Sequence, residues 1–111
     1  MKASVPIERA RELLSDESND PRWTTPELVD LCELAEAEIY RLRPDSVYTD
    51  AIVTTAPGVL ENENSDLHVR GEFSEALAYF MASRALVEDS ERGGDPGLAS
   101  TYLSEFGRLL S

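Results

Sequence analysis

Residues 73–87 read FSEALAYFMASRALV, an apolar stretch that predicts an α-helix with hydrophobic side chains on nearly every face. The breaker GGDPG follows at residues 93–97, and residues 98–110 predict a second, amphipathic helix. A loop this short favours antiparallel packing of the two helices. A helix that is apolar all round must be covered on all sides. We expect a chain of 111 residues to supply only part of that cover, and further copies of the same chain to supply the rest.

Two more helices are predicted upstream of this hairpin. Apolar residues recur at helical spacing over residues 7–14, and Ser4 is the expected N-cap of that short helix. A longer helix is predicted to begin at Thr25, as N-cap, with Pro26 in the first helical position. It is predicted to end at Pro44, because proline cannot continue a helix.

The segment at residues 45–71 is the irregular part of the chain. Its β-branched run at residues 51–55 is typical of a short strand, and residues 61–66 (ENENSD) are typical of an exposed acidic loop. Residues 67–69 predict either a second short strand or an irregular lead into the next helix. The sequence therefore predicts a single domain over residues 1–111, mainly α. We expect a compact bundle of about four helices, with a short β-like or irregular insert between the second and third main helices.

The chain is strongly acidic: 22 acids and 10 bases give a net charge of −12. Nucleic-acid-binding proteins usually carry a basic patch, and none is visible in the sequence. An acidic surface repels DNA, which favours passage past the protein over binding. The single cysteine, Cys32, cannot form an internal disulfide and suits a reducing compartment. We expect no signal peptide, no membrane helix and a cytoplasmic setting, or a particle assembled there.

No catalytic, metal-binding or cofactor-binding residues are predicted. Cys32 is expected on the buried face of its helix, where a free cysteine acts as a small hydrophobe. His68 is the only histidine and cannot form a metal site alone. The acidic run at residues 61–66 lacks the glycine and glutamate that a calcium loop requires at its sixth and twelfth positions.

Trp23 and Arg84 stand out as structural or interface residues. Trp23, just before a helix start, is expected to pack on its own helix; the alternative is an interface anchor. Arg84 is a charge within an apolar helix, so it either extends to the surface or pairs with an acid. Glu88 lies one turn further on, and Glu38, Asp89 or an acid of a neighbouring chain are the other candidates. We favour intramolecular roles for both residues.

Several segments in order resemble a known family. They are RELLSD at residues 11–16, Arg22-Trp23, TPEL leading into a helix that ends LRPD, EALAYFMASRALVEDSE at residues 75–91 and LASTYLSEF at residues 98–106. This order resembles the small helical head-to-tail connector, or adaptor, proteins of tailed bacteriophages. In that family a helix of the type ALxxYxxxRAxxxD precedes a helix of the type AxxYxxxF. The matching positions here are Ala76, Leu77, Arg84, Ala85, Asp89, Ala99, Tyr102 and Phe106.

The resemblance implies a virion protein of the head-to-tail interface, assembled in the host cytoplasm. It implies a homo-oligomeric ring docked beneath the portal protein, bridging to a tail or stopper protein, with no membrane partner. Genomic DNA would pass through the ring without sequence-specific binding, and an acidic lumen would let it slide. Trp23, Arg84, Asp89, Tyr102 and Phe106 are the structural or interface candidates.

Two other interpretations stay open. The chain could be a small acidic helical regulator or adaptor, similar to an antitoxin, that binds a partner protein through the C-terminal hairpin and masks a basic surface. It could also be an enzyme that uses carboxylates of the long helix, Asp30 and Glu33 with Glu36. Their spacing also fits a plain solvated helix face, which we prefer.

Overall fold

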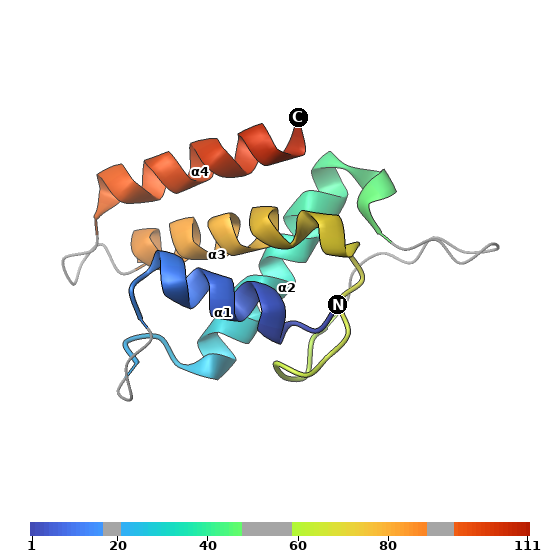
Figure 1. Cartoon of the computed structure of the whole chain (residues 1–111), viewed down its shortest axis with the longest axis horizontal. Coiled ribbons are helices and arrows are strands. Elements are labelled where there is room, and N and C mark those ends of the chain that lie inside the picture. Colours follow the sequence, from blue (N-terminus) through green and yellow to red (C-terminus); the bar gives the residue numbers. More distant parts are fainter. Residues whose placement is uncertain (17–20, 48–58, 89–94) are drawn as a thin grey trace.

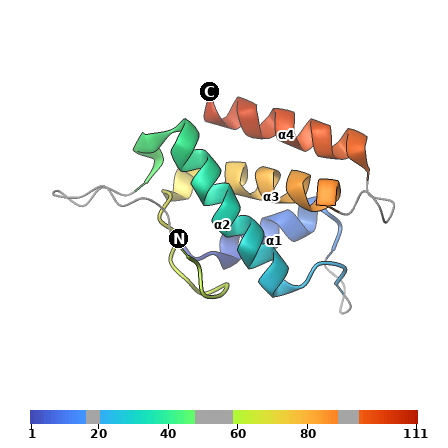
Figure 2. The same cartoon turned by 180° about the vertical axis from the view of Figure 1, so that it is seen from behind.

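Helix α3 (Ser74–Glu88) lies at the centre of the molecule, between α1 (Ser4–Leu13) and α4 (Pro96–Leu110), with α2 (Thr25–Leu42) crossing behind it (Figures 1 and 2). The computed structural model describes residues 1–16, 21–47, 59–88 and 95–111. Over these residues the protein is a compact all-α globule of four α-helices, and none of them forms a strand. The predicted mainly α bundle is confirmed.

The other three helices cover most of α3. Its buried side chains are Ala76, Leu77, Ala78, Met81, Ala82, Ser83, Ala85 and Leu86. Of its large apolar residues, Val87 is exposed, and Tyr79 and Phe80 are partly buried against the core. The expectation that one chain supplies only part of this cover, and further copies the rest, is wrong for most of the helix, because α1, α2 and α4 pack around it.

The α3–α4 hairpin is antiparallel, as predicted (Figure 1). Two aromatic pairs join the helices: the ring centroids of Tyr79 and Tyr102 lie 5.5 Å apart, and those of Phe80 and Phe106 lie 5.1 Å apart. The Ser83 hydroxyl donates to the carbonyl of Ala99 at 2.8 Å. A buried serine in an apolar helix therefore has a partner on the facing helix.

Both predicted N-caps are off by one residue. Thr24, in extended conformation, caps α2, and its hydroxyl accepts the Glu27 N–H at 3.3 Å. Thr25 is already helical, and its hydroxyl accepts a hydrogen bond from Arg11 instead. At α1 the N-cap is Ala3, which offers no side-chain cap.

Carbonyl groups of the insert satisfy the start of α1. The N–H of Ala3 donates to the carbonyl of Ser65 at 2.9 Å, and the N–H of Ser4 donates to that of Glu63 at 2.7 Å. Free N–H groups at a helix start need such partners. A distant segment thus takes the place of the predicted Ser4 cap.

Two further helix ends also shift slightly. Helix α2 ends at Leu42, and Pro44 then opens a short 3-10 helix, η1 (Pro44–Ser46). Helix α4 begins at Pro96, ahead of the predicted residue 98, because the Asp95 carboxylate caps it by accepting the Leu98 N–H at 3.0 Å.

The insert returns to the core after residue 59. Single β-bridges join Val47 to Val69 and Lys2 to Asp66, and η2 (Gly71–Phe73) leads into α3. Of the two structures predicted for residues 67–69, the irregular lead is the one observed. The predicted strand at residues 51–55 lies outside the described residues.

Candidate functional site

The lead into α2 is held by an ion pair that is largely shielded from solvent. Arg11 Nη1 lies 3.0 Å from Asp16 Oδ2 and donates to the Trp23 carbonyl at 2.9 Å. The Asp16 carboxylate accepts the backbone N–H groups of Arg22, at 2.8 Å, and Trp23, at 3.2 Å. Both backbone polar groups of Trp23 are therefore fixed. These residues belong to two of the segments on which the connector resemblance rests.

The Trp23 side chain is 7% exposed, in keeping with an intramolecular role. The Arg22 guanidinium lies over its ring, 5.2 Å from the centroid. One side of Trp23 borders a surface hollow together with Leu31 and Leu34. The residue is thus both a core residue and part of a concave surface.

Arg84 extends to the surface and also pairs with an acid. Its Nε lies 3.8 Å from Glu88 Oε1, and about half of each side chain is exposed. Its charge also helps, after the hydrogen bonds from Arg41, to hold the pKa of Glu38 below its usual range. An exposed pair at this spacing stabilises a helix by about 0.3–0.5 kcal/mol. Asp89, the other predicted partner, lies outside the described residues.

Phe106 is buried in the core, and Tyr102 is partly buried against it. The Tyr102 hydroxyl donates to the carbonyl of Leu13 at 2.7 Å and joins α4 to the end of α1. Burial, and then the nearby Tyr79, raise the pKa of Tyr102. Phe106 is 4% exposed and rests on Phe80. Both residues therefore make their contacts within the same chain.

Glu36 is fully buried, which corrects the expectation that it shares a solvated face with Asp30 and Glu33. Its Oε2 accepts the backbone N–H groups of His68, at 2.7 Å, and Val69, at 2.8 Å. Its Oε1 lies 3.4 Å from His68 Nδ1. The signal was present in the sequence, because Glu36 lies one turn from Cys32 within the apolar stripe of its helix.

Cys32 is buried beside this carboxylate. Burial first, and then the charge of Glu36, raise the pKa of the thiol to about 12. A thiol is nucleophilic only as the thiolate. His68 contacts Glu36 and, among the described residues, makes no hydrogen bond to Cys32. Cys32 and His68 are therefore not arranged as a nucleophile and its general base.

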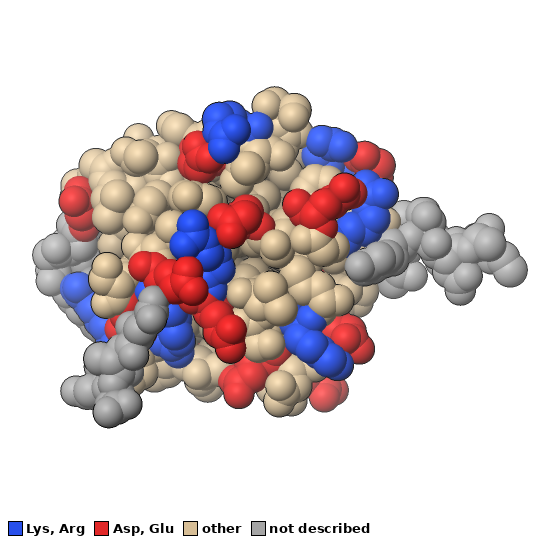
Figure 3. Space-filling model, in the orientation of Figure 1, with Lys and Arg blue, Asp and Glu red and all other residues tan. Residues whose placement is uncertain are grey.

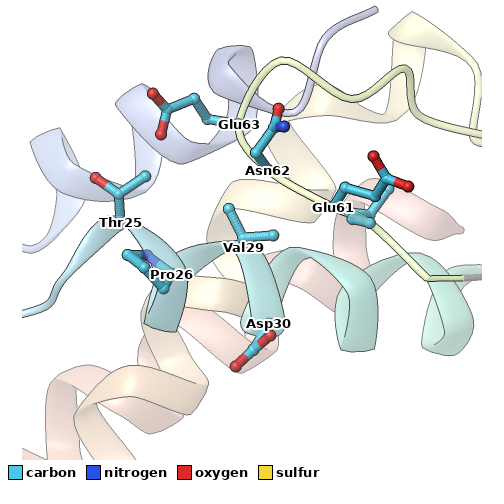
Figure 4. A pocket seen from close by; sticks show the side chains of 8 residues that line it. Thr25, Pro26, Val29, Asp30, Glu61, Asn62 and Glu63 are labelled. Carbon is cyan, nitrogen blue, oxygen red and sulfur yellow. The ribbon is translucent and has the colours of Figure 1, made fainter.

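Two surface hollows flank the N-terminal half of α2 and share Asp30. The first, which we name the loop groove, has a volume of about 200 Å³ and lies between α2 and residues 60–63 (Figure 4). Its lining residues are Thr25, Pro26, Val29, Asp30, Leu60, Glu61, Asn62 and Glu63. The second, the Trp23 groove, has a volume of about 350 Å³. Its lining residues are Trp23, Glu27, Asp30, Leu31, Leu34 and Glu88.

The charges of the molecule are unevenly satisfied. Each cation in the following list forms an ion pair with an acid: Lys2, Arg9, Arg11, Arg41, Arg43, Arg70, Arg84 and Arg108. On the face drawn in Figure 3, basic groups accordingly lie beside acidic ones. Four acids that line the grooves take part in none of the ion pairs formed among the described residues: Glu27, Asp30, Glu61 and Glu63. The acids that line the grooves make them negative, and Arg22, whose guanidinium lies over the Trp23 ring, is a cation beside the Trp23 groove.

The described part of the chain contains neither a candidate metal site nor a candidate membrane-spanning helix. None of its His, Cys, Asp and Glu side chains form a group of three or more that could hold a metal ion. None of its helices combines the length and the hydropathy that crossing a membrane requires.

No protein-family model matches the chain, and neither a curated protein nor a solved structure shows significant similarity to it. The resemblance to phage head-to-tail connectors stays a prediction that rests on the segments quoted above. What the structure adds is the placement of those segments.

Proposed function

We propose that the protein is a structural head-to-tail connector of a tailed-phage virion, without enzymatic activity. In this role it forms a ring of identical subunits beneath the portal and bridges the capsid vertex to a tail or stopper protein. The observation that carries the proposal is the pairing of Phe80 with Phe106 across the α3–α4 hairpin. Phe106 is a matching position of the second connector-type pattern, and Phe80 lies on the helix that carries the first, so the two patterns belong to one contiguous packing unit.

The N-terminal segments of the resemblance support the same proposal. Arg11 and Asp16 belong to the first segment, and Trp23 belongs to the second. They form one hydrogen-bonded cluster between α1 and α2.

The charge pattern suits a channel through which DNA passes. DNA is held by cations that release its counterions. The cations in ion pairs are partly neutralised by their neighbours, and the chain carries a net charge of −12. A ring of such subunits would repel DNA from its wall, so DNA would move through without sequence-specific binding.

Helix α3 does not itself call for a ring of subunits. Since α3 is covered within the chain, it leaves little apolar surface for a neighbour. Exposed apolar side chains remain on other helices, among them Val5 on α1, Leu42 on α2 and Leu103 on α4. A head-to-tail ring needs two different contact faces on each subunit. Sedimentation velocity of the purified chain, alone and with the portal protein of the same phage, tests whether such faces exist.

The second candidate is a small acidic regulator or adaptor, antitoxin-like, that binds a partner protein. The acid-rimmed grooves beside α2 favour it, because such a surface suits a basic partner. This candidate predicts a one-to-one or two-to-two complex. A connector predicts a larger closed ring, so the mass of the complex separates the two.

A further inference from the structure

We propose that the loop groove and the Trp23 groove together form a docking surface for an extended segment of another protein. In this segment lysine or arginine residues alternate with apolar ones. The inference concerns a partner site on the isolated subunit and does not depend on the ring. It rests on three observations: the apolar floors, the acidic rims and the adjacency of the two grooves at Asp30.

The floors of both grooves are apolar. Pro26, Val29 and Leu60 contribute apolar surface to the loop groove. In Figure 4, Val29 of α2 lies across from Asn62 of the loop. The volumes of about 200 and 350 Å³ lie at or below the low end of the roughly 300–1,000 Å³ of small-molecule sites. Side chains of a partner therefore fit these grooves better than a cofactor does.

The floor of the Trp23 groove is preformed. Trp23 is held through both of its backbone polar groups by Arg11 and Asp16, so it does not have to be ordered on binding. Leu34, on the next turns of α2, is 41% exposed in the free protein. Covering this leucine would bury apolar surface at no cost in rearrangement.

The rims are negative and available. Asp30 and Glu61 line the loop groove, Glu27 and Asp30 line the Trp23 groove, and none of these three forms an ion pair among the described residues. Complementary charge sets partner choice at such a surface. It favours a basic segment, and it excludes nucleic acid, which would be repelled.

The charge also argues against a second copy of this chain as the occupant. A copy would bring the same net charge of −12. Its cations at Arg9, Arg43 and Arg70 are already engaged with acids of their own chain. The partner is therefore a different protein.

The two grooves are neighbours on α2, because Asp30 lines both. An extended segment alternates its side chains between two faces. Apolar side chains on one face would reach the two floors, and the long side chains of the intervening cations would bend back around the segment to the rim carboxylates. One short segment can thus use both grooves.

The test is a panel of fluorescein-labelled peptides of about nine residues, which span ~30 Å when extended. One alternates leucine with arginine, one glycine with arginine, and one leucine with serine. Binding is measured by fluorescence anisotropy at about 0.15 M salt, where long-range attraction is screened. We expect the leucine–arginine peptide to bind more tightly than either control peptide.

Matched variants locate the site. We expect Asp30→Asn with Glu61→Gln, and separately Leu34→Ser, to weaken binding by about 5-fold or more, the effect of losing one or two surface contacts. Glu72→Gln with Glu105→Gln makes the same charge change elsewhere, and Leu103→Ser changes another half-exposed leucine. These control variants should bind as the natural chain does.

Four results would each overturn the proposal. The first is failure of the leucine–arginine peptide to bind. The second and third are equal binding of the glycine–arginine peptide and equal loss in the control variants, either of which would indicate diffuse attraction. The fourth is the break-up of self-assembly by Leu34→Ser in sedimentation, which would make a second copy the occupant. Ring formation is read from sedimentation without peptide, so failure of the ring is distinguishable from failure of the groove.

Discussion

The carboxylate of Glu36 on α2 accepts the backbone N–H of Val69 at 2.8 Å in the protein interior. The same oxygen accepts the N–H of His68 at 2.7 Å. One buried side chain thus fixes the returning end of the insert to the longest helix. Because Val69 also bridges to Val47, this contact connects both ends of the insert.

We expect Glu36→Ala to lower the free energy of unfolding by about 3 kcal/mol, because the buried N–H of Val69 and the partly buried N–H of His68 lose a charged acceptor. Glu36→Gln keeps one amide oxygen and should cost less. Urea denaturation followed by circular dichroism measures both. Glu33→Ala, on the same helix, is the control and should change stability by less than about 0.5 kcal/mol. Equal effects at the two positions would show that Glu36 does not hold the insert.

The Arg11–Asp16 pair predicts a second stability effect. Asp16→Ala leaves Arg11 without its carboxylate partner and should destabilise the fold by about 3 kcal/mol. It also releases the backbone N–H of Trp23, the only tryptophan, so the emission of the native state should shift to longer wavelength. Asp45→Asn, which removes an exposed partner of Arg43, should leave the emission unchanged. An unshifted spectrum in Asp16→Ala would contradict the proposed role of this pair.

The Cys32 thiol should resist modification in the folded protein. Burial and Glu36 raise its pKa from 9.0 to about 12, so the thiolate is scarce near pH 8. A thiol-specific reagent should therefore react slowly until the chain is unfolded in urea. Rapid, complete reaction of the native protein would show that the thiol is accessible.

The raised pKa of Cys32 also makes the free energy of unfolding depend on pH. Below about pH 9 the thiol is protonated in both states, and its contribution to stability is complete. Above that pH the unfolded chain loses the proton while the folded chain keeps it, so stability falls as pH rises towards 12. Cys32→Ala should remove this part of the alkaline loss, as measured by urea denaturation at increasing pH. An identical pH profile in the variant would exclude the thiol as its source.

Tyr102 joins α4 to α1 through one hydrogen bond to Leu13. Tyr102→Phe keeps the aromatic contact with Tyr79 and removes only this bond, so we expect a loss of about 1 kcal/mol. Tyr40→Phe removes a partly exposed hydroxyl elsewhere and serves as the control. Thermal unfolding should separate the two variants, and matching melting temperatures would argue that the bond contributes nothing.

The helices were predictable because their signals are local. The apolar stretch around Met81, the proline at position 26 and the breaker before Gly97 predict elements without knowledge of the fold. The ends were less predictable, because long-range contacts compete with caps. Arg11 donates a hydrogen bond to the Thr25 hydroxyl, and backbone carbonyl groups of the insert accept the N–H groups at the start of α1.

The candidate site was mostly hidden from sequence reasoning. Trp23 is a candidate from the sequence, but its groove also requires Leu34 of α2 and Glu88, which is distant in sequence, to line the same hollow. The loop groove depends on where Leu60 lies relative to α2, which no local sequence pattern specifies. Glu36 was misread because a glutamate is normally solvated, although its helical position pointed inward.

The most direct test of the proposed function is negative-stain electron microscopy of the chain mixed with portal particles of the same phage. We predict a closed ring of subunits, coaxial with the portal channel and seated on one of its faces, together with sedimenting species much heavier than the 12.3 kDa chain. Bare portal particles and a chain that stays monomeric, or that forms only a one-to-one or two-to-two complex with a partner, would contradict the connector and favour the acidic regulator.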